Sequence, residues 1–94
     1  MPETLQILHY DYVSDIAERR VEHRPGHLEL IQAFHADSRL VIAGAVGDPP
    51  SYGLLVFRDV ASAEAFAADD PYVAAGLVTR WTVEPWNVVT TMVQ

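Results

Sequence analysis

Hydrophobic and polar residues alternate along residues 4–12, TLQILHYDY, and this alternation predicts a β-strand because neighbouring strand side chains point to opposite faces. One face would carry Leu5, Ile7 and His9, and the other Gln6, Leu8, Tyr10 and Tyr12. Large apolar side chains fall on both faces, so we expect both to be at least partly covered. Residues 15–22 are charged and predict a short helix that Ser14 or Asp15 can cap.

The segment RPGHLELIQAFH, residues 24–35, has its apolar residues at helical spacing. Pro25 is typical of a first helical turn, where its missing N–H costs nothing, and the predicted helix covers 25–37. Leu30, Ile31 and Phe34 form its buried stripe. His27 extends this stripe by one turn, which predicts an inward-facing imidazole at the N-terminal end of the helix.

The rest of the chain alternates short apolar segments with turns and one Ala-rich helix. The predicted elements are a strand over 39–46, a turn over 47–51, a strand over 52–60, a helix over 61–70, a helical turn over 71–76, a strand over 79–86 and a short fifth strand over 87–93. Ser62 can cap the Ala-rich helix, whose Ala63, Phe66 and Ala67 should face the sheet. This helix should end before Pro71, because a residue that precedes proline avoids helical backbone.

The order strand, helix, strand, strand, helix, strand predicts the ferredoxin-like split β-α-β fold of the α+β class. Such a fold has an antiparallel four-stranded sheet with both main helices on one face. The other face needs a cover, and half of the 94 residues are hydrophobic, which is rich for so short a chain. We therefore expect a single domain over residues 1–94 that forms a homodimer by packing two sheets face to face.

Charge and composition exclude several classes of function. The chain has 13 acidic and 6 basic residues, and a net charge of −7 repels nucleic-acid phosphates. There is no cysteine, which excludes disulfides, thiolate nucleophiles and cysteine metal sites. No signal-peptide pattern and no apolar run of membrane-spanning length is present. We expect a cytoplasmic protein that binds neither nucleic acid nor a membrane.

His27 is the residue whose position packing alone does not explain. The dipole of the helix favours a neutral imidazole at its N-terminus, and a neutral imidazole with an acidic partner is a competent general base. The alternative is a histidine at the edge of the core that binds one backbone carbonyl. Arg24 could hold an anionic or enolate oxygen beside it, or form a surface salt bridge. The other histidines have no ligand spacing that indicates a metal site, so none is expected.

The segment DDPY, residues 69–72, is the second candidate for chemistry. Asp70 can cap the turn that follows it, or its carboxylate can orient the His27 imidazole as a third group orients the base of a triad. Tyr72 could place a hydroxyl in the same pocket or serve as a packed aromatic ring. Both predicted helices lie on one face of the sheet, so contact between these two segments is possible.

Taken in order, HRPGHLELIQAF, RLVIAGAV, GLLVFRDVASAEAFAADDPYVAAGLV and VEPW resemble the YCII-related (YciI-like) domain family over nearly the whole chain. The most specific pieces are the R-P-x-H opening of the main helix and the D-P-Y-x-x-A-G-L segment. The resemblance implies a dimeric α+β barrel and a histidine–aspartate catalytic dyad. The matching residues are His27 and Asp70, and Arg24 matches the arginine that opens the first motif.

These features predict a cofactor-free enzyme that transfers a proton on a small aromatic or conjugated substrate, as a lyase or isomerase does. His27 and Asp70 would be catalytic, and Arg24 and Tyr72 would bind the substrate. One alternative is a non-catalytic module of the same fold that binds a small molecule or a protein. Another is a cofactor-free monooxygenase, which would consume oxygen.

Overall fold

The structure is a computed structural model, and it describes residues 3–90. The elements are β1 Glu3–Tyr12, α1 Ile16–Arg19, α2 Arg24–Ala36, β2 Leu40–Val46, β3 Tyr52–Phe57, α3 Val60–Asp69, α4 Pro71–Ala74 and β4 Val78–Val88. The four strands form one antiparallel sheet in the order β2-β3-β1-β4. This order and the helices between the strands are those of the ferredoxin-like α+β fold, as the sequence predicts.

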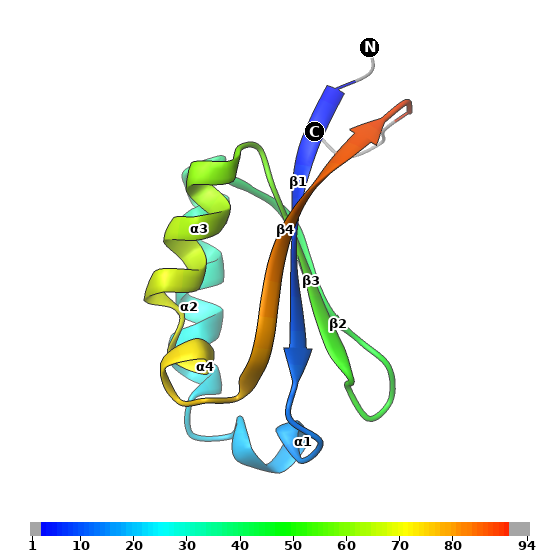
Figure 1. Ribbon diagram of the computed structural model, residues 1–94. Helices are drawn as coiled ribbons and strands as arrows, with labels where there is room; N and C mark the ends of the chain where they lie inside the picture. The colour runs from blue at the N-terminus through cyan, green and yellow to red at the C-terminus, as the bar shows by residue number, and fades with distance from the viewer. Residues whose placement is uncertain (1–2, 91–94) are drawn as a thin grey trace.

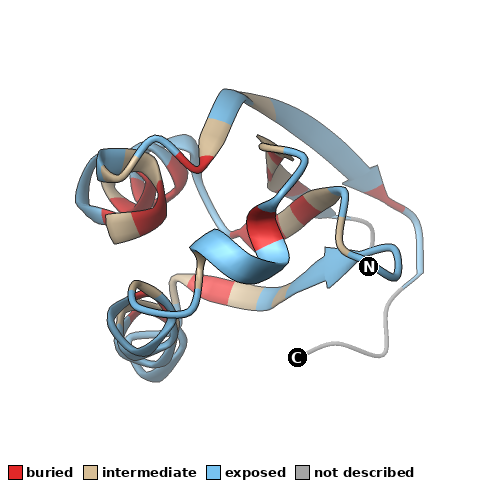
Figure 2. Cartoon of the chain, turned by 90° about the horizontal axis from the view of Figure 1, so that it is seen from below, coloured by how far each residue is buried: buried red, intermediate tan, exposed pale blue. Residues whose placement is uncertain are grey.

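The helices α2, α3 and α4 cover one face of the sheet, and no element of the described residues covers the other face (Figure 1). The alternation of β1 explains the two layers, because Leu8 and Tyr10 point toward the helices. Figure 2 shows buried positions on both layers and exposed positions over much of the helix surface. The main core between the layers consists of Leu8, Tyr10, Phe34, Leu40, Leu55, Phe57, Ala63, Phe66 and Ala67.

The opposite face of the sheet carries a smaller apolar cluster, formed by Leu5, Val56 and Val88 with Ile7 and Val41 packed against it. The strand register places Trp86 beside Leu5 and Ile42 beside Val56. Trp86 and Ile42 are 47% and 55% exposed, so this face presents large apolar side chains to solvent.

Two predicted caps are wrong. Asp15 precedes α1 but its side chain makes no capping hydrogen bond. Asp59, and not Ser62, caps α3: its Oδ1 accepts the Ser62 N–H at 2.7 Å, while Ser62 itself is buried within the helix. Asp59 has an extended backbone and a short side-chain acceptor, which is the combination that an N-cap position favours. Because α3 already begins at Val60, β3 cannot continue to residue 60, and it ends at Phe57.

The predicted fifth strand over 87–93 is also wrong in its described part. Asn87 and Val88 belong to β4, which pairs with β1 from Val78 to Val88, and residues 91–93 lie outside the described residues. Among residues 3–90, no helix is both long and apolar enough to cross a membrane.

We predict that Asp59→Ala lowers the free energy of unfolding by about 1 kcal/mol, because α3 loses its capping acceptor. Asp59→Asn should cost much less, since the amide oxygen can still accept the Ser62 N–H. Hydrogen bonds from Ser62 lower the pKa of Asp59, so its carboxylate stabilises the fold above the unfolded-state pKa. That contribution should be lost as the pH falls through the folded-state pKa.

Urea unfolding of the two variants and the parent protein at pH 7 and pH 3 measures both effects. Equal stability of Asp59→Ala and the parent at pH 7 would contradict this assignment of the cap.

Candidate functional site

Asp70 lies at the junction of α3 and α4, where Pro71 sets its backbone. Asp70 has the extended conformation expected before proline, with φ −73° and ψ 122°. Its carboxylate caps α4, and Oδ1 accepts the backbone N–H of Tyr72 at 3.0 Å. The residue is only 1% exposed, so its charge is held inside the protein and not in solvent.

The carboxylate of Asp70 contacts the His27 imidazole. The Nδ1 atom of His27 lies 2.9 Å from Oδ1 and 3.0 Å from Oδ2 of Asp70. Gly26 allows this approach, because a Cβ at position 26 would lie 3.3 Å from the Pro71 side chain. The structure thus brings together the two segments, RPGH and DDPY, that the sequence could only suggest were neighbours.

Tyr10 of β1 is a third member of this network, and the sequence reasoning missed it. Its hydroxyl donates to Asp70 Oδ2 at 2.8 Å, and the residue is fully buried. Burial raises the pKa of Tyr10, and the nearby negative charge of Asp70 raises it further. The hydroxyl therefore stays protonated and remains a donor. The only sequence signal was the strand alternation, which places Tyr10 on the helix face.

The His27 ring is held in a defined orientation. It stacks on Tyr72, with ring centroids 3.7 Å apart and an interplanar angle of 5°. It also makes an edge-to-face contact with Phe66, in which the ring centroids are 6.1 Å apart. Since a carboxylate only accepts hydrogen bonds, the contact with Asp70 places the proton of a neutral imidazole on Nδ1. The other nitrogen, Nε2, then has a free lone pair, as a general base requires.

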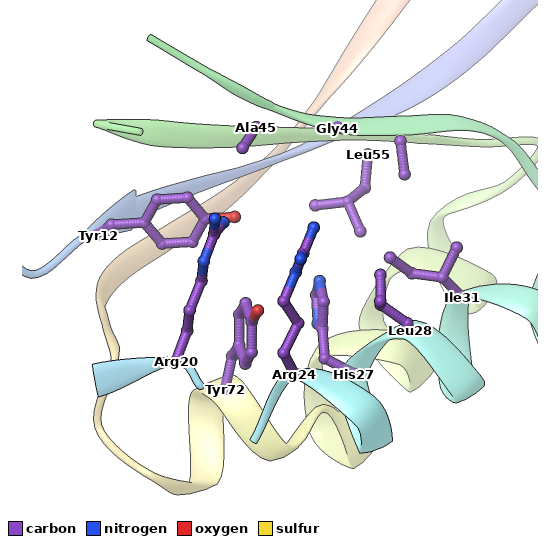
Figure 3. A pocket seen from close by; sticks show the side chains of 11 residues that line it. Tyr12, Arg20, Arg24, His27, Leu28, Ile31, Gly44, Ala45, Leu55 and Tyr72 are labelled. Carbon is purple, nitrogen blue, oxygen red and sulfur yellow. The ribbon is translucent and has the colours of Figure 1, made fainter. Parts of the chain in front are cut away.

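A cavity of about 240 Å³ lies between the start of α2 and the sheet (Figure 3). It is lined by Tyr12, Arg20, Arg24, His27, Leu28, Ile31, Ala43, Gly44, Ala45, Leu55 and Tyr72. Thus three of the four predicted site residues, His27, Arg24 and Tyr72, border one space, and Asp70 lies behind His27. Gly44 of β2 lines the opposite wall.

The cavity also has polar residues that the sequence reasoning did not name. Burial raises the pKa of Tyr12 to about 12, and burial likewise raises the pKa of Tyr72 against the opposing charges of Arg20 and Arg24. Both hydroxyls are therefore neutral at physiological pH. Arg20 lies in the turn between α1 and α2, and its spacing from Arg24 and His27, at i, i+4 and i+7, is the sequence signal that could have indicated it.

The remaining histidines lie away from this cavity. His9 faces the other side of the sheet, with Nε2 3.0 Å from Asp11 Oδ1 and its ring stacked on Tyr52. His23 precedes α2 as its N-cap residue, and His35 is exposed near its end. Within residues 3–90, no three histidine or carboxylate side chains are grouped as a metal site would require.

Fold and site together define a small α+β protein with a buried histidine–aspartate pair at a ligand-sized cavity. Residues 4–87 match the YCII-related domain family, and the chain belongs to that family. It is 32% identical to Protein YciI of Escherichia coli O6:H1 over 96 aligned positions, covering 90% of this chain and 98% of that protein.

Two solved structures share the fold. The first is the 5-chloro-2-hydroxyhydroquinone dehydrochlorinase of Burkholderia phenoliruptrix AC1100 in complex with 2,5-dihydroxybenzoquinone, with a TM-score of 0.71 and 18% identity over 88% of this chain and 93% of that one. The second is a candidate antibiotic biosynthesis monooxygenase from Deinococcus radiodurans, with a TM-score of 0.55 and 12% identity over 95% of both chains. At these identities the likeness establishes the common fold alone.

We predict that Asp70→Ala lowers the free energy of unfolding by roughly 2–4 kcal/mol, because it leaves Tyr10 and His27 without their buried acceptor. Tyr10→Phe should cost about 1 kcal/mol, since Asp70 keeps two other donors. Tyr52→Phe is the matched control: that ring is only partly buried on the other face of the sheet.

Urea unfolding of the three variants measures this order of stability. A Tyr10→Phe variant no less stable than Tyr52→Phe would show that the Tyr10–Asp70 hydrogen bond contributes little to the fold.

Proposed function

We propose that the protein is a small cofactor-free enzyme of lyase or isomerase type that transfers a proton on a small aromatic or conjugated substrate. The observation that carries this proposal is the His27–Asp70 pair at the wall of the cavity. His27 is the general base, and Asp70 holds its tautomer and balances the charge of the imidazolium that forms. Arg24 and Tyr72 bind the substrate.

In the proposed step, Nε2 of His27 takes a proton from a carbon or hydroxyl next to the conjugated system. The electron pair left behind moves into that system, and negative charge develops on a carbonyl oxygen. The Arg24 guanidinium stabilises this oxyanion. An isomerase then returns the proton from His27 to a different carbon, whereas a lyase expels a leaving group from the substrate.

The structural relatives support a ring compound as substrate. The dehydrochlorinase of the same fold is described in complex with 2,5-dihydroxybenzoquinone, which is a small conjugated ring. A cavity of about 240 Å³ falls below the ~300 Å³ at which pockets for drug-sized ligands begin, so it suits a single substituted ring.

The proposal predicts His27-dependent exchange of acidic protons for deuterium. Small conjugated ring compounds are incubated with the protein in D₂O, and the loss of their C–H signals is followed by proton NMR. We expect His27→Gln to slow exchange of an active compound by about 100-fold or more, as removal of a general base does. Asp70→Asn should also slow it, because an amide does not balance the imidazolium charge.

His35→Gln is the matched control, since His35 lies on the same helix but is exposed. Unchanged exchange in a folded His27→Gln variant would refute the role of His27. Binding without any chemical change would instead favour a non-catalytic ligand-binding module. Oxygen uptake with quinol-type compounds would favour the monooxygenase alternative.

We further propose that the chain functions as a homodimer in the cytoplasm, with residues 1–94 forming one domain. The exposed apolar side chains on the uncovered face of the sheet, Ile42 and Trp86, support this pairing. Two copies packed sheet to sheet would form the α+β barrel and remove these side chains from water.

Light scattering after size-exclusion chromatography tests the dimer. We expect a species of about twice 10.4 kDa at micromolar concentration, and a monomer for Ile42→Glu because a carboxylate would be buried in the interface. Val60→Glu on the helical layer is the control, as Val60 is similarly exposed at 45%. A parent protein that elutes only as a monomer would rule out this assembly.

A further inference from the structure

The charge of the cavity is opposite to that of the whole chain. The chain has 13 acidic and 6 basic residues, yet two arginines, Arg20 and Arg24, are among the 11 residues that line the cavity. None of those lining residues is an aspartate or a glutamate. A positive pocket in an acidic protein attracts small anions and raises their local concentration.

The backbone between α1 and α2 places the two arginines side by side. The Arg20 carbonyl accepts the N–H of Arg24 at 2.7 Å, and the His23 carbonyl accepts the N–H of His27 at 3.1 Å. These i, i+4 bonds continue the helical turn, so side chains four residues apart are neighbours. Figure 3 shows both guanidinium groups extending from the helical side toward the sheet, with Arg24 beside the His27 ring and Arg20 beside the Tyr12 ring.

Neither guanidinium is neutralised by a carboxylate of the described chain. Among residues 3–90, the arginine ion pairs are Arg19 with Asp15 and Arg39 with Asp37. Asp70, the acid of the site, accepts its hydrogen bonds from His27, Tyr10 and the Tyr72 backbone. Arg24 also shares a hydrogen bond with the Tyr72 side chain, but the positive charges of Arg20 and Arg24 remain without a partner carboxylate in this part of the chain and can pair with an anionic ligand.

We infer that Arg20 and Arg24 together form a carboxylate site, and that the substrate class is a small conjugated carboxylic acid. A guanidinium matches a planar carboxylate through two parallel N–H···O bonds, and an arginine pair can hold both its oxygens. His27 lies one turn further along the same face, so a bound acid presents its conjugated carbons to Nε2. This substrate class rests on the proposed function, whereas binding of the carboxylate does not require catalysis.

Benzoate and benzamide are the probes, because they share one shape and differ in charge. Isothermal titration calorimetry or NMR titration of the whole chain should show benzoate binding at least about tenfold more tightly than benzamide. Arg20→Gln and Arg24→Gln should each weaken benzoate about tenfold and leave benzamide unchanged, since each removes charged hydrogen bonds. Arg20→Lys should recover part of the loss, because it keeps the charge without the paired donors.

Arg19→Gln is the matched control, as it makes the same change in net charge one residue away and lies outside the cavity. Circular dichroism confirms that each variant is folded. Equal affinity for benzoate and benzamide, or an effect of Arg19→Gln as large as that of Arg20→Gln, would overturn the inference. Inorganic phosphate that binds as tightly as benzoate would also overturn it, by indicating a general anion site.

The two proposals fail separately. Arginine-dependent benzoate binding that persists in His27→Gln, with no carboxylic acid showing exchange, would leave the carboxylate site and refute the catalytic function. If neutral compounds alone show His27-dependent exchange, and Arg20→Gln does not affect it, the catalytic function would stand and the carboxylate site would be refuted.

Discussion

The Asp70 carboxylate is the interaction on which the site depends. It is almost fully buried, and it accepts hydrogen bonds from the Tyr10 hydroxyl, the His27 imidazole and the Tyr72 backbone. A buried charge is costly unless its acceptors are satisfied, so each donor contributes to stability as well as to geometry. One carboxylate thereby joins the sheet through β1, the main helix through α2 and the short helix α4.

This arrangement explains how a chain of 94 residues holds a base in a fixed orientation. A small domain has a thin core, and side chains near its edge are usually mobile. Here the His27 ring is held by Asp70 on one nitrogen, by Tyr72 on one face and by Phe66 at its edge. The restraint comes from residues that also complete the core, so orientation of the base and packing are achieved by the same contacts.

Much of the fold could be predicted from the sequence, because strand alternation and helical spacing are local patterns. They identified the two faces of β1, the inward position of His27 and the end of α3 before Pro71. Caps were less predictable, since Asp59 and Ser62 both suit the start of a helix and only the backbone decides between them. The contact of His27 with Asp70 joins residues 43 positions apart, and spacing alone could not establish it. Tyr10 was missed for the same reason.

The alternation of side chains along β1 restricts which mutations this strand can accept. Alternate residues of this central strand serve two surfaces: Tyr10 and Tyr12 point toward the site, while Ile7 and His9 point toward the uncovered face. A single inserted or deleted residue within β1 would exchange the two sets, putting a histidine or an aspartate where a buried hydroxyl now stands. β1 can therefore accept point substitutions but not a change in its length.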